Sequence, residues 1–175
     1  MPVPLIWLGA GIAALYAGDK VHRANKIKRQ YVKHYPGEEQ SFVHLQDGAI
    51  VCCGIFGVFE HTGIWVDGNI IELKGNGLIR GISPQRFLTK RSGECIYVVC
   101  NDLGEALISP HAAKTAVSKL YNYSDYDLIK NNCHRFVWRC VSNSEELITS
   151  FSDLNNALFG YFNSSLSWRP ADFNR

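Results

Sequence analysis

The sequence predicts an α+β fold in which a small antiparallel β-sheet packs against helices. Residues 49–56 form a continuous apolar run that follows a glycine, which is typical of a buried strand. Two further apolar runs within residues 59–73 are separated by Asp67-Gly68, the dipeptide that most strongly indicates a β-hairpin. Apolar residues at helical spacing then begin at Cys133. Strands therefore dominate the first half and an amphipathic helix follows them.

The remaining elements are weaker predictions. Short strands are expected at 78–82 and 95–100, and helices at 83–88, 109–121, 145–151 and 154–162. Pro84 and Pro110 stand where proline suits the first turn of a helix.

The helix that begins at Cys133 is the most informative element. Asn132 is a preferred N-cap residue, because its side chain accepts a hydrogen bond from a free amide of the first turn. The apolar stripe starts with the thiol and continues through Phe136, Val137, Cys140 and Val141. Amides and dipole at a helix N-terminus favour a thiolate, so Cys133 is a candidate nucleophile. The alternative is a small buried core cysteine. The same helical spacing turns His134 and Arg135 away from the stripe, although first-turn side chains can still border the mouth of a site, and neither is expected to be catalytic.

A cysteine nucleophile needs a base and a group that orients the base. With Asp67-Gly68 as a two-residue turn, Trp65 pairs with Ile70, and His61 and Glu72 project from the same face of the hairpin. Glu72 is then a diagonal neighbour within reach of the His61 ring. The alternative is a strand histidine and an unrelated surface glutamate, because a turn longer by one residue would reverse the faces.

These residues resemble the lecithin retinol acyltransferase (LRAT)-like group, a circularly permuted relative of the NlpC/P60 thiol peptidases. The resemblance covers residues 45–141 and depends on the order His61, Glu72, Cys133 and on the Asn-Cys-x-x-Phe motif at the helix start. It implies a papain-like permuted fold, with Cys133 as nucleophile, His61 as base and Glu72 as the orienting residue. The usual motif of that group is Asn-Cys-Glu-His-Phe and its third residue is often histidine, so this chain departs at two places.

The resemblance implies a cysteine acyltransferase or phospholipase-type hydrolase that acts through a thioester on phospholipid or other acyl ester or amide substrates. Two alternatives stay open: a thiol peptidase or amidase of the NlpC/P60 type, and an LRAT-like interaction module without catalysis. No cofactor is expected. The six cysteines include no C-x-x-C pair, so no metal site is expected either. Four cysteines lie in apolar runs and are expected to be reduced, although the sequence leaves their disulfide state open: Cys52, Cys53, Cys95 and Cys100.

Residues 2–18 carry no charge and would span about 25 Å as a helix, close to the thickness of a bilayer core of about 30 Å. Basic residues follow this segment, which favours an uncleaved anchor over residues 1–18 with the domain facing the cytoplasm. A cleaved signal peptide, a reversed topology and a buried N-terminal helix of a soluble protein are the alternatives. The bilayer and an acyl-bearing lipid are therefore the expected partners.

The domain organisation follows from this anchor. Residues 19–40 form a basic segment and linker, 41–143 the LRAT-like catalytic domain and 144–175 a helical tail. Six Lys or Arg against one Asp give residues 19–35 a charge of +5, and since the net charge is +2, the rest carries −3. The basic segment would favour anionic headgroups, or would simply flank the anchor. No basic face is left on the domain, so nucleic-acid binding is not expected.

Overall fold

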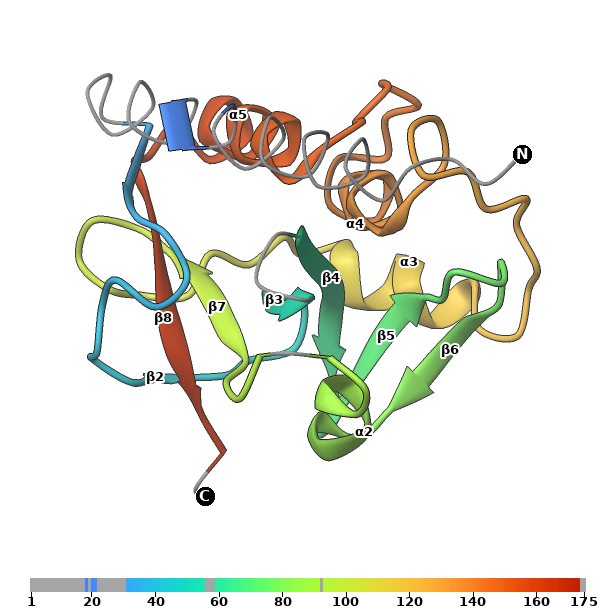
Figure 1. Cartoon of the computed structure of the whole chain (residues 1–175), viewed down its shortest axis with the longest axis horizontal. Helices are drawn as coiled ribbons and strands as arrows, with labels where there is room; N and C mark the ends of the chain where they lie inside the picture. Colours follow the sequence, from blue (N-terminus) through green and yellow to red (C-terminus); the bar gives the residue numbers. More distant parts are fainter. Residues whose placement is uncertain (1–17, 19, 22–30, 56–58, 92, 174–175) are drawn as a thin grey trace, which may run out of the picture.

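The computed structural model describes residues 18, 20–21, 31–55, 59–91 and 93–173. Within these residues it contains one eight-stranded sheet and four helices (Figure 1). The strands are β1 (Val32–His34), β2 (Val43–His44), β3 (Ile50–Ile55), β4 (Phe59–Val66), β5 (Asn69–Leu73), β6 (Ile79–Ile82), β7 (Tyr97–Cys100) and β8 (Leu166–Asp172). The helices are α2 (Pro84–Leu88), α3 (Ala112–Ser118), α4 (Cys133–Ser142) and α5 (Phe151–Phe162).

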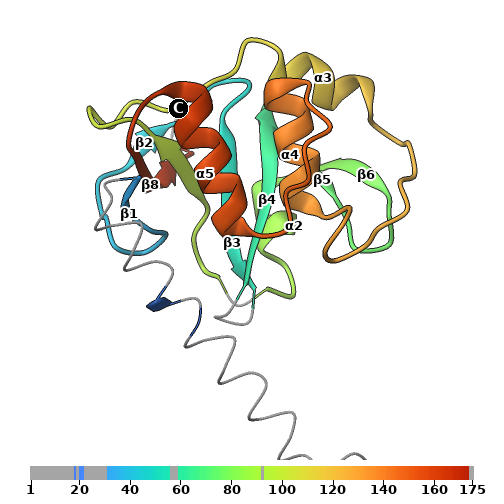
Figure 2. The ribbon, with the colours of Figure 1, turned by 90° about the horizontal axis from the view of Figure 1, so that it is seen from above.

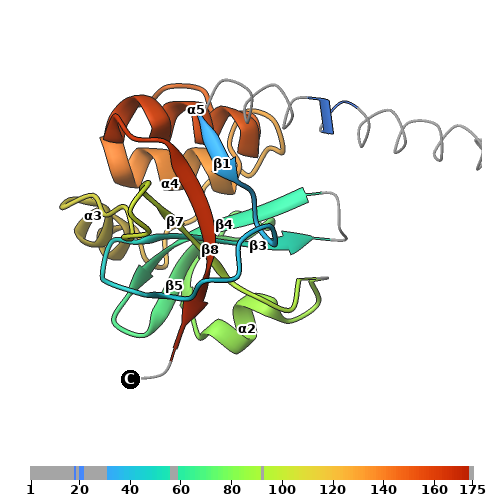
Figure 3. The ribbon, with the colours of Figure 1, turned by 90° about the vertical axis from the view of Figure 1, so that its left-hand side faces the viewer.

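The sheet is mostly antiparallel and has the order β1-β8-β7-β3-β4-β5-β6, with β2 paired to β8. Only the pairings of β1 and β2 with β8 are parallel among the described strands. Helices α4 and α5 cover one face and α2 lies on the other (Figure 3). In Figure 2, α4 and α5 lie side by side with α4 over β4. The α+β class predicted from the sequence is confirmed.

Both faces of the sheet are buried. Alternate residues of β3 enter two different cores: Ile50 and Cys52 contact the side of α4 and α5, whereas Val51 and Cys53 contact the side of α2. This alternation is the period-2 geometry of a strand. It explains why the sequence of β3 is apolar throughout instead of alternating with polar residues.

The hairpin β4–β5 has the predicted register. Asp67 and Gly68 have φ angles of 47° and 75°, the two consecutive left-handed residues of a tight hairpin turn. The pairs Val66–Asn69, Trp65–Ile70 and Ile64–Ile71 follow. The pairing of β4 with β5 ends at Ile64–Ile71, although β4 begins at Phe59. Figure 1 shows the two strands diverging beneath α4. This divergence leaves the start of β4 beside the N-terminus of α4.

Gly63 stands where β4 leaves β5, and we expect Gly63→Ala to destabilise the fold. A Cβ at this position would lie 2.5 Å from the Ile70 side chain and 2.9 Å from the Ile71 carbonyl oxygen. Backbone cannot move aside easily, so we expect a loss of about 1–3 kcal/mol in the free energy of unfolding, measured by urea denaturation. Gly160→Ala is the matched control, because nothing lies within 4 Å of its Cβ and alanine is the better helix former. Equal stability of the two variants would contradict this account of Gly63.

The segment after Ser144 differs from the predicted helical tail. The helix expected at 145–151 is absent from the described structure, and α5 begins at Phe151. Residues 166–172, which the prediction included in the helical tail, form β8, which lies between β7 and the pair β1 and β2. Pro170 argues against a strand prediction at these residues, because proline is rare within sheets. The fully buried Trp168 anchors it, and its indole N–H donates to the Asn155 side-chain oxygen in α5 at 2.9 Å.

The N-terminal prediction needs correction. Residues 1–17 of the expected anchor lie outside the described residues, as does most of the basic segment that follows. Within the described part of the chain, every helix is too short or too polar to cross a bilayer. The prediction of a single-pass membrane protein, with its domain facing the cytoplasm, is therefore not supported.

Candidate active site

Cys133 is the first residue of α4, as the sequence predicts. The Asn132 side chain accepts a hydrogen bond from the Arg135 amide at 3.0 Å, which caps the helix. The Asn132 amide group donates in turn to the carbonyl oxygens of Leu128 and Thr149, at 3.0 and 3.1 Å. The cap thus ties the helix start to two loops and fixes the position of the thiol. The Cys133 side chain is buried, with the residue only 5 % exposed.

His61 and Glu72 are in contact, as the hairpin register predicts. Nε2 of His61 lies 2.7 Å from Oε2 of Glu72, and the two residues are 5 % and 0 % exposed. They extend from β4 and β5 toward the side of α2, where the His61 ring packs against Phe87 with its centroid 5.3 Å away. With Nε2 engaged by the carboxylate, Nδ1 is the nitrogen of His61 that remains for the thiol.

The Glu72 carboxylate also accepts hydrogen bonds from two arginines that the sequence analysis missed. Arg80 contacts Oε1 through Nε at 2.8 Å and Nη2 at 2.7 Å, and Arg91 Nη2 lies 2.8 Å from Oε2. Arg80 is the cross-strand partner of Glu72 in β6, so the register of the β5–β6 hairpin would have found it. Burial by itself raises the pKa of Glu72, but the hydrogen bond and charge of His61 and the charge of Arg91 lower it to about 2. Glu72 is therefore ionised throughout the physiological pH range.

The surroundings of Cys133 favour the thiolate. Burial opposes ionisation, but the positive charges of His134 and His61, together with side-chain hydrogen bonds from both rings, hold the pKa of Cys133 well below its ordinary value. The structure therefore brings Cys133, His61 and Glu72 together in one connected cluster, although they come from α4, β4 and β5.

His61 is correspondingly held as an imidazolium. Burial lowers the pKa of His61, but the charge and hydrogen bond of the Cys133 thiolate and the hydrogen bond of Glu72 outweigh it, and the pKa rises to about 9. The ring therefore keeps its proton across neutral pH. The positive ring lies between two negative groups, which is the arrangement that stabilises an ion pair in a buried site.

Removing the thiolate is expected to lower the pKa of His61 markedly. In wild type the ring should titrate near pH 9. In Cys133→Ala the negative charge that most strongly raises the pKa of His61 is gone, so burial should lower the midpoint toward or below 6.5. Ring proton NMR across pH measures both midpoints, and the signal is assigned by its loss in His61→Asn. An unchanged midpoint in Cys133→Ala would show that the thiol carries no charge beside the ring.

The other cysteines have no such environment. Burial raises the pKa of Cys53, Cys100 and Cys140 to about 12 in each case. All six cysteines are free, and Cys95 is exposed although the sequence predicted a core position. A low thiol pKa is therefore a property of the position of Cys133 at the head of α4 and not of buried cysteines in this fold.

His134 lies closer to the thiol than the helical spacing predicts. Its ring is buried, with the residue 8 % exposed, and Nδ1 lies 3.9 Å from the Cys133 sulfur and 3.1 Å from Oγ1 of Thr62. Helical side chains lean toward the N-terminus of their helix, and in the first turn this brings residue two over residue one. The immediate adjacency of His134 to the thiol was the signal in the sequence. Arg135 instead donates to the carbonyl oxygens of Lys130 and Glu145.

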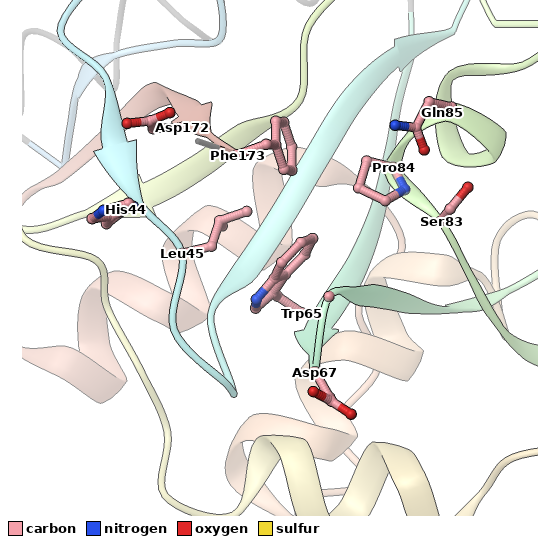
Figure 4. A pocket seen from close by; sticks show the side chains of 10 residues that line it. His44, Leu45, Trp65, Asp67, Ser83, Pro84, Gln85, Asp172 and Phe173 are labelled. Atoms are coloured by element: carbon pink, nitrogen blue, oxygen red, sulfur yellow. The ribbon is translucent and has the colours of Figure 1, made fainter. Parts of the chain in front are cut away.

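A cavity within the described residues lies away from this cluster (Figure 4). It has a volume of about 470 Å³ and is lined by His44, Leu45, Trp65, Asp67, Gly68, Ser83, Pro84, Gln85, Asp172 and Phe173. Trp65 and Phe173 form its aromatic wall, with ring centroids 5.7 Å apart. Neither Cys133 nor His61 lines it, so it is not the site of any chemistry that uses the thiolate.

The described residues include no group of three or more His, Cys, Asp or Glu side chains arranged to hold a metal ion. What the Cys133 cluster offers is a buried thiolate, an imidazolium beside it and a carboxylate that fixes the ring. Covalent acyl transfer requires groups of these three kinds: a nucleophile, a proton carrier and a group that orients it. No family model, curated protein or solved structure matches this chain in the comparisons with known proteins.

Proposed function

We propose that this protein is a cysteine-dependent acyltransferase or acyl hydrolase of LRAT-like fold. Cys133 is the nucleophile, His61 transfers the proton and Glu72 orients the His61 ring. The observation that carries the proposal is the buried chain of contacts from the Cys133 thiolate through His61 to Glu72, with 2.7 Å between the last two side chains. The order of the three residues along the chain and the Asn-Cys-x-x-Phe motif support the same assignment.

In the acylation step, the Cys133 thiolate attacks the carbonyl carbon of an ester or amide. A carbon–sulfur bond forms and the carbonyl oxygen takes the negative charge. Backbone amides at the start of α4 would stabilise the oxyanion. When the intermediate collapses, the bond to the leaving oxygen or nitrogen breaks, and His61 gives its proton to that atom. The products are a thioester on Cys133 and a neutral alcohol or amine.

In the deacylation step, neutral His61 takes a proton from water or from an acceptor alcohol or amine as that group attacks the thioester. The carbon–sulfur bond breaks and the sulfur leaves as the thiolate. The ion pair of Cys133 and His61 is thereby restored. Glu72 holds Nε2 of His61 throughout, so Nδ1 faces the reaction in both steps. General acid–base assistance of this kind typically contributes about 10²–10⁴-fold to a rate.

The substrate that we propose is an acyl lipid, with phospholipid as the first choice. Three exposed apolar side chains belong to segments that carry the site: Phe59 precedes His61 by two residues in β4, and Leu128 and Ile129 belong to the loop held by Asn132. Exposed apolar side chains near a site favour an apolar ligand. The implied preference of the LRAT-like group for phospholipid acyl donors agrees with these surroundings.

The test is the intact mass of the protein after incubation with phosphatidylcholine vesicles and an acid quench, with free fatty acid measured in parallel. We expect an increase by one acyl group in wild type, or release of fatty acid where deacylation is fast. Both should disappear in Cys133→Ala. Cys140→Ala removes a buried thiol from the same helix and is the matched control, which should retain both. Absence of adduct and product in folded wild type, or their persistence in Cys133→Ala, would contradict the proposal.

A further inference from the structure

The Cys133 sulfur interacts with two imidazole rings rather than one. His61 belongs to β4, and Thr62, the next residue of that strand, contacts His134. Since successive residues of a strand point to opposite faces, His61 reaches the sulfur from the side of α2, whereas Thr62 and His134 lie on the side of α4. The Cys133 sulfur lies 3.9 Å from Nδ1 of His134, and both rings lower the pKa of the thiol. A single proton carrier is sufficient for the acyl transfer described above, so the second ring needs its own explanation.

The two rings have different partners. His61 is paired through Nε2 with the Glu72 carboxylate, which stabilises the ring when it is positively charged. His134 is held by a neutral hydroxyl, with 3.1 Å between its Nδ1 and Oγ1 of Thr62, and by the aromatic ring of Phe151, whose centroid lies 5.7 Å away. An ionised partner stabilises an imidazolium more strongly than a hydroxyl does. The environment of His61 therefore suits a ring that gains and loses a proton. The environment of His134 suits a ring that keeps one protonation state.

We propose that His134 is a second catalytic histidine, whose Nδ1 proton is shared between the Cys133 sulfur, at 3.9 Å, and Oγ1 of Thr62, at 3.1 Å, with Thr62 as the residue that positions the ring. The inference rests on the proposed function and assigns different work to the two histidines. His61 moves the proton between sulfur and substrate. His134 stabilises the sulfur as it regains its negative charge.

The role of His134 is greatest in deacylation. Acylation consumes the negative charge of the sulfur in the new carbon–sulfur bond, and His61 passes its proton to the leaving group. When the thioester breaks, the electron pair of the carbon–sulfur bond returns to sulfur while His61 takes a proton from water or the acceptor. Hydrogen bonding from His134 stabilises the departing thiolate, and His134 itself ends each step with the proton that it began with.

The test is the pH dependence of Cys133 alkylation by iodoacetamide, followed by peptide mass spectrometry in the full-length protein. Peptide resolution separates Cys133 from the exposed Cys95, which reports any general change in reagent reactivity. His134→Phe removes the donor, and since a hydrogen bond to a charged group contributes about 1.5–3 kcal/mol, the alkylation midpoint should rise by about one to two pH units. Thr62→Val leaves the ring but removes its positioning hydroxyl, and should raise the midpoint by a smaller amount. His134→Asn keeps a donor near the Nδ1 position, so its alkylation midpoint should rise less than that of His134→Phe.

His111→Asn, at an exposed histidine, is the matched control and should leave the midpoint unchanged. A midpoint that stays at the wild-type value in both Thr62→Val and the folded His134 variants would overturn the inference, and Thr62→Val decides alone if His134→Phe does not fold. His61→Asn separates this outcome from failure of the proposed function. If the alkylation midpoint shifts in His61→Asn but not in the Thr62 and His134 variants, only the role of His134 is contradicted. If it shifts in no variant, the proposed thiolate site itself is contradicted.

Discussion

Replacing Cys133 by serine is expected to lower acyl turnover by on the order of 10⁴-fold or more, the range found when a covalent nucleophile is lost. A serine hydroxyl has almost the same shape as the thiol but does not ionise beside His61. The ion pair that we propose between Cys133 and His61 therefore cannot form in this variant. Fatty acid release from phosphatidylcholine vesicles measures the loss, and circular dichroism checks that the fold is retained.

Cys133 and His61 are expected to act as one unit, so their effects on turnover should not add. His61→Asn should lower turnover nearly as far as Cys133→Ser, and the double variant should be little worse than either single one, since each removes the same ion pair. Independent losses that multiply in the double variant would show that the two residues act at separate sites.

Glu72→Gln is expected to lower the free energy of unfolding by about 3–5 kcal/mol, the cost of breaking a buried ion pair by removing one partner. The fully buried carboxylate is contacted by Arg80, Arg91 and His61, and an amide nitrogen in its place would face a donor instead of accepting from it. The variant should also lose activity, because nothing then fixes the His61 ring. Urea denaturation measures the first effect and fatty acid release the second.

The same carboxylate predicts how stability depends on pH. The pKa of Glu72 is about 2 in the folded protein and 4.5 for an ordinary glutamate, so its contribution is fully present above pH 4.5 and is lost as the pH falls toward 2. Wild type should therefore lose stability over this range more steeply than Glu72→Gln. Glu145→Gln is the matched control: Glu145 also pairs with two arginines, but its side chain is 77 % exposed, and such pairs contribute about 0–1 kcal/mol. Equal losses in the two variants would contradict the buried role of Glu72.

The sequence was sufficient where the determining interactions are local. The Asp67-Gly68 turn sets the register of β4 and β5 within a few residues, and this register places Glu72 beside His61. Asn132 likewise fixes the start of α4 at Cys133 through a hydrogen bond within one turn. Short-range rules of this kind need no knowledge of the rest of the fold.

Contacts between distant segments were not predictable in the same way. Arg91 reaches Glu72 from beyond α2, and Thr62 meets His134 across 72 residues of sequence. Strand β8 pairs in parallel with β1 across more than 130 residues, and its proline and polar residues give it no apolar run. Such contacts are fixed by how the sheet and helices pack, which the hydrophobic pattern of each segment does not specify.

The central claim is that Cys133 is a thiolate at and below neutral pH because His61 is charged beside it. The most direct test is the alkylation rate of Cys133 at about pH 6, relative to the exposed Cys95 in the same molecule, since an ordinary thiol of pKa about 8.5 is almost fully protonated there. Cys133 should react at a rate that changes little between about pH 6 and 8, and His61→Asn should make it rise steeply with pH as an ordinary thiol does. A wild-type rate that already rises about tenfold per pH unit, as that of a protonated thiol does, would contradict the account.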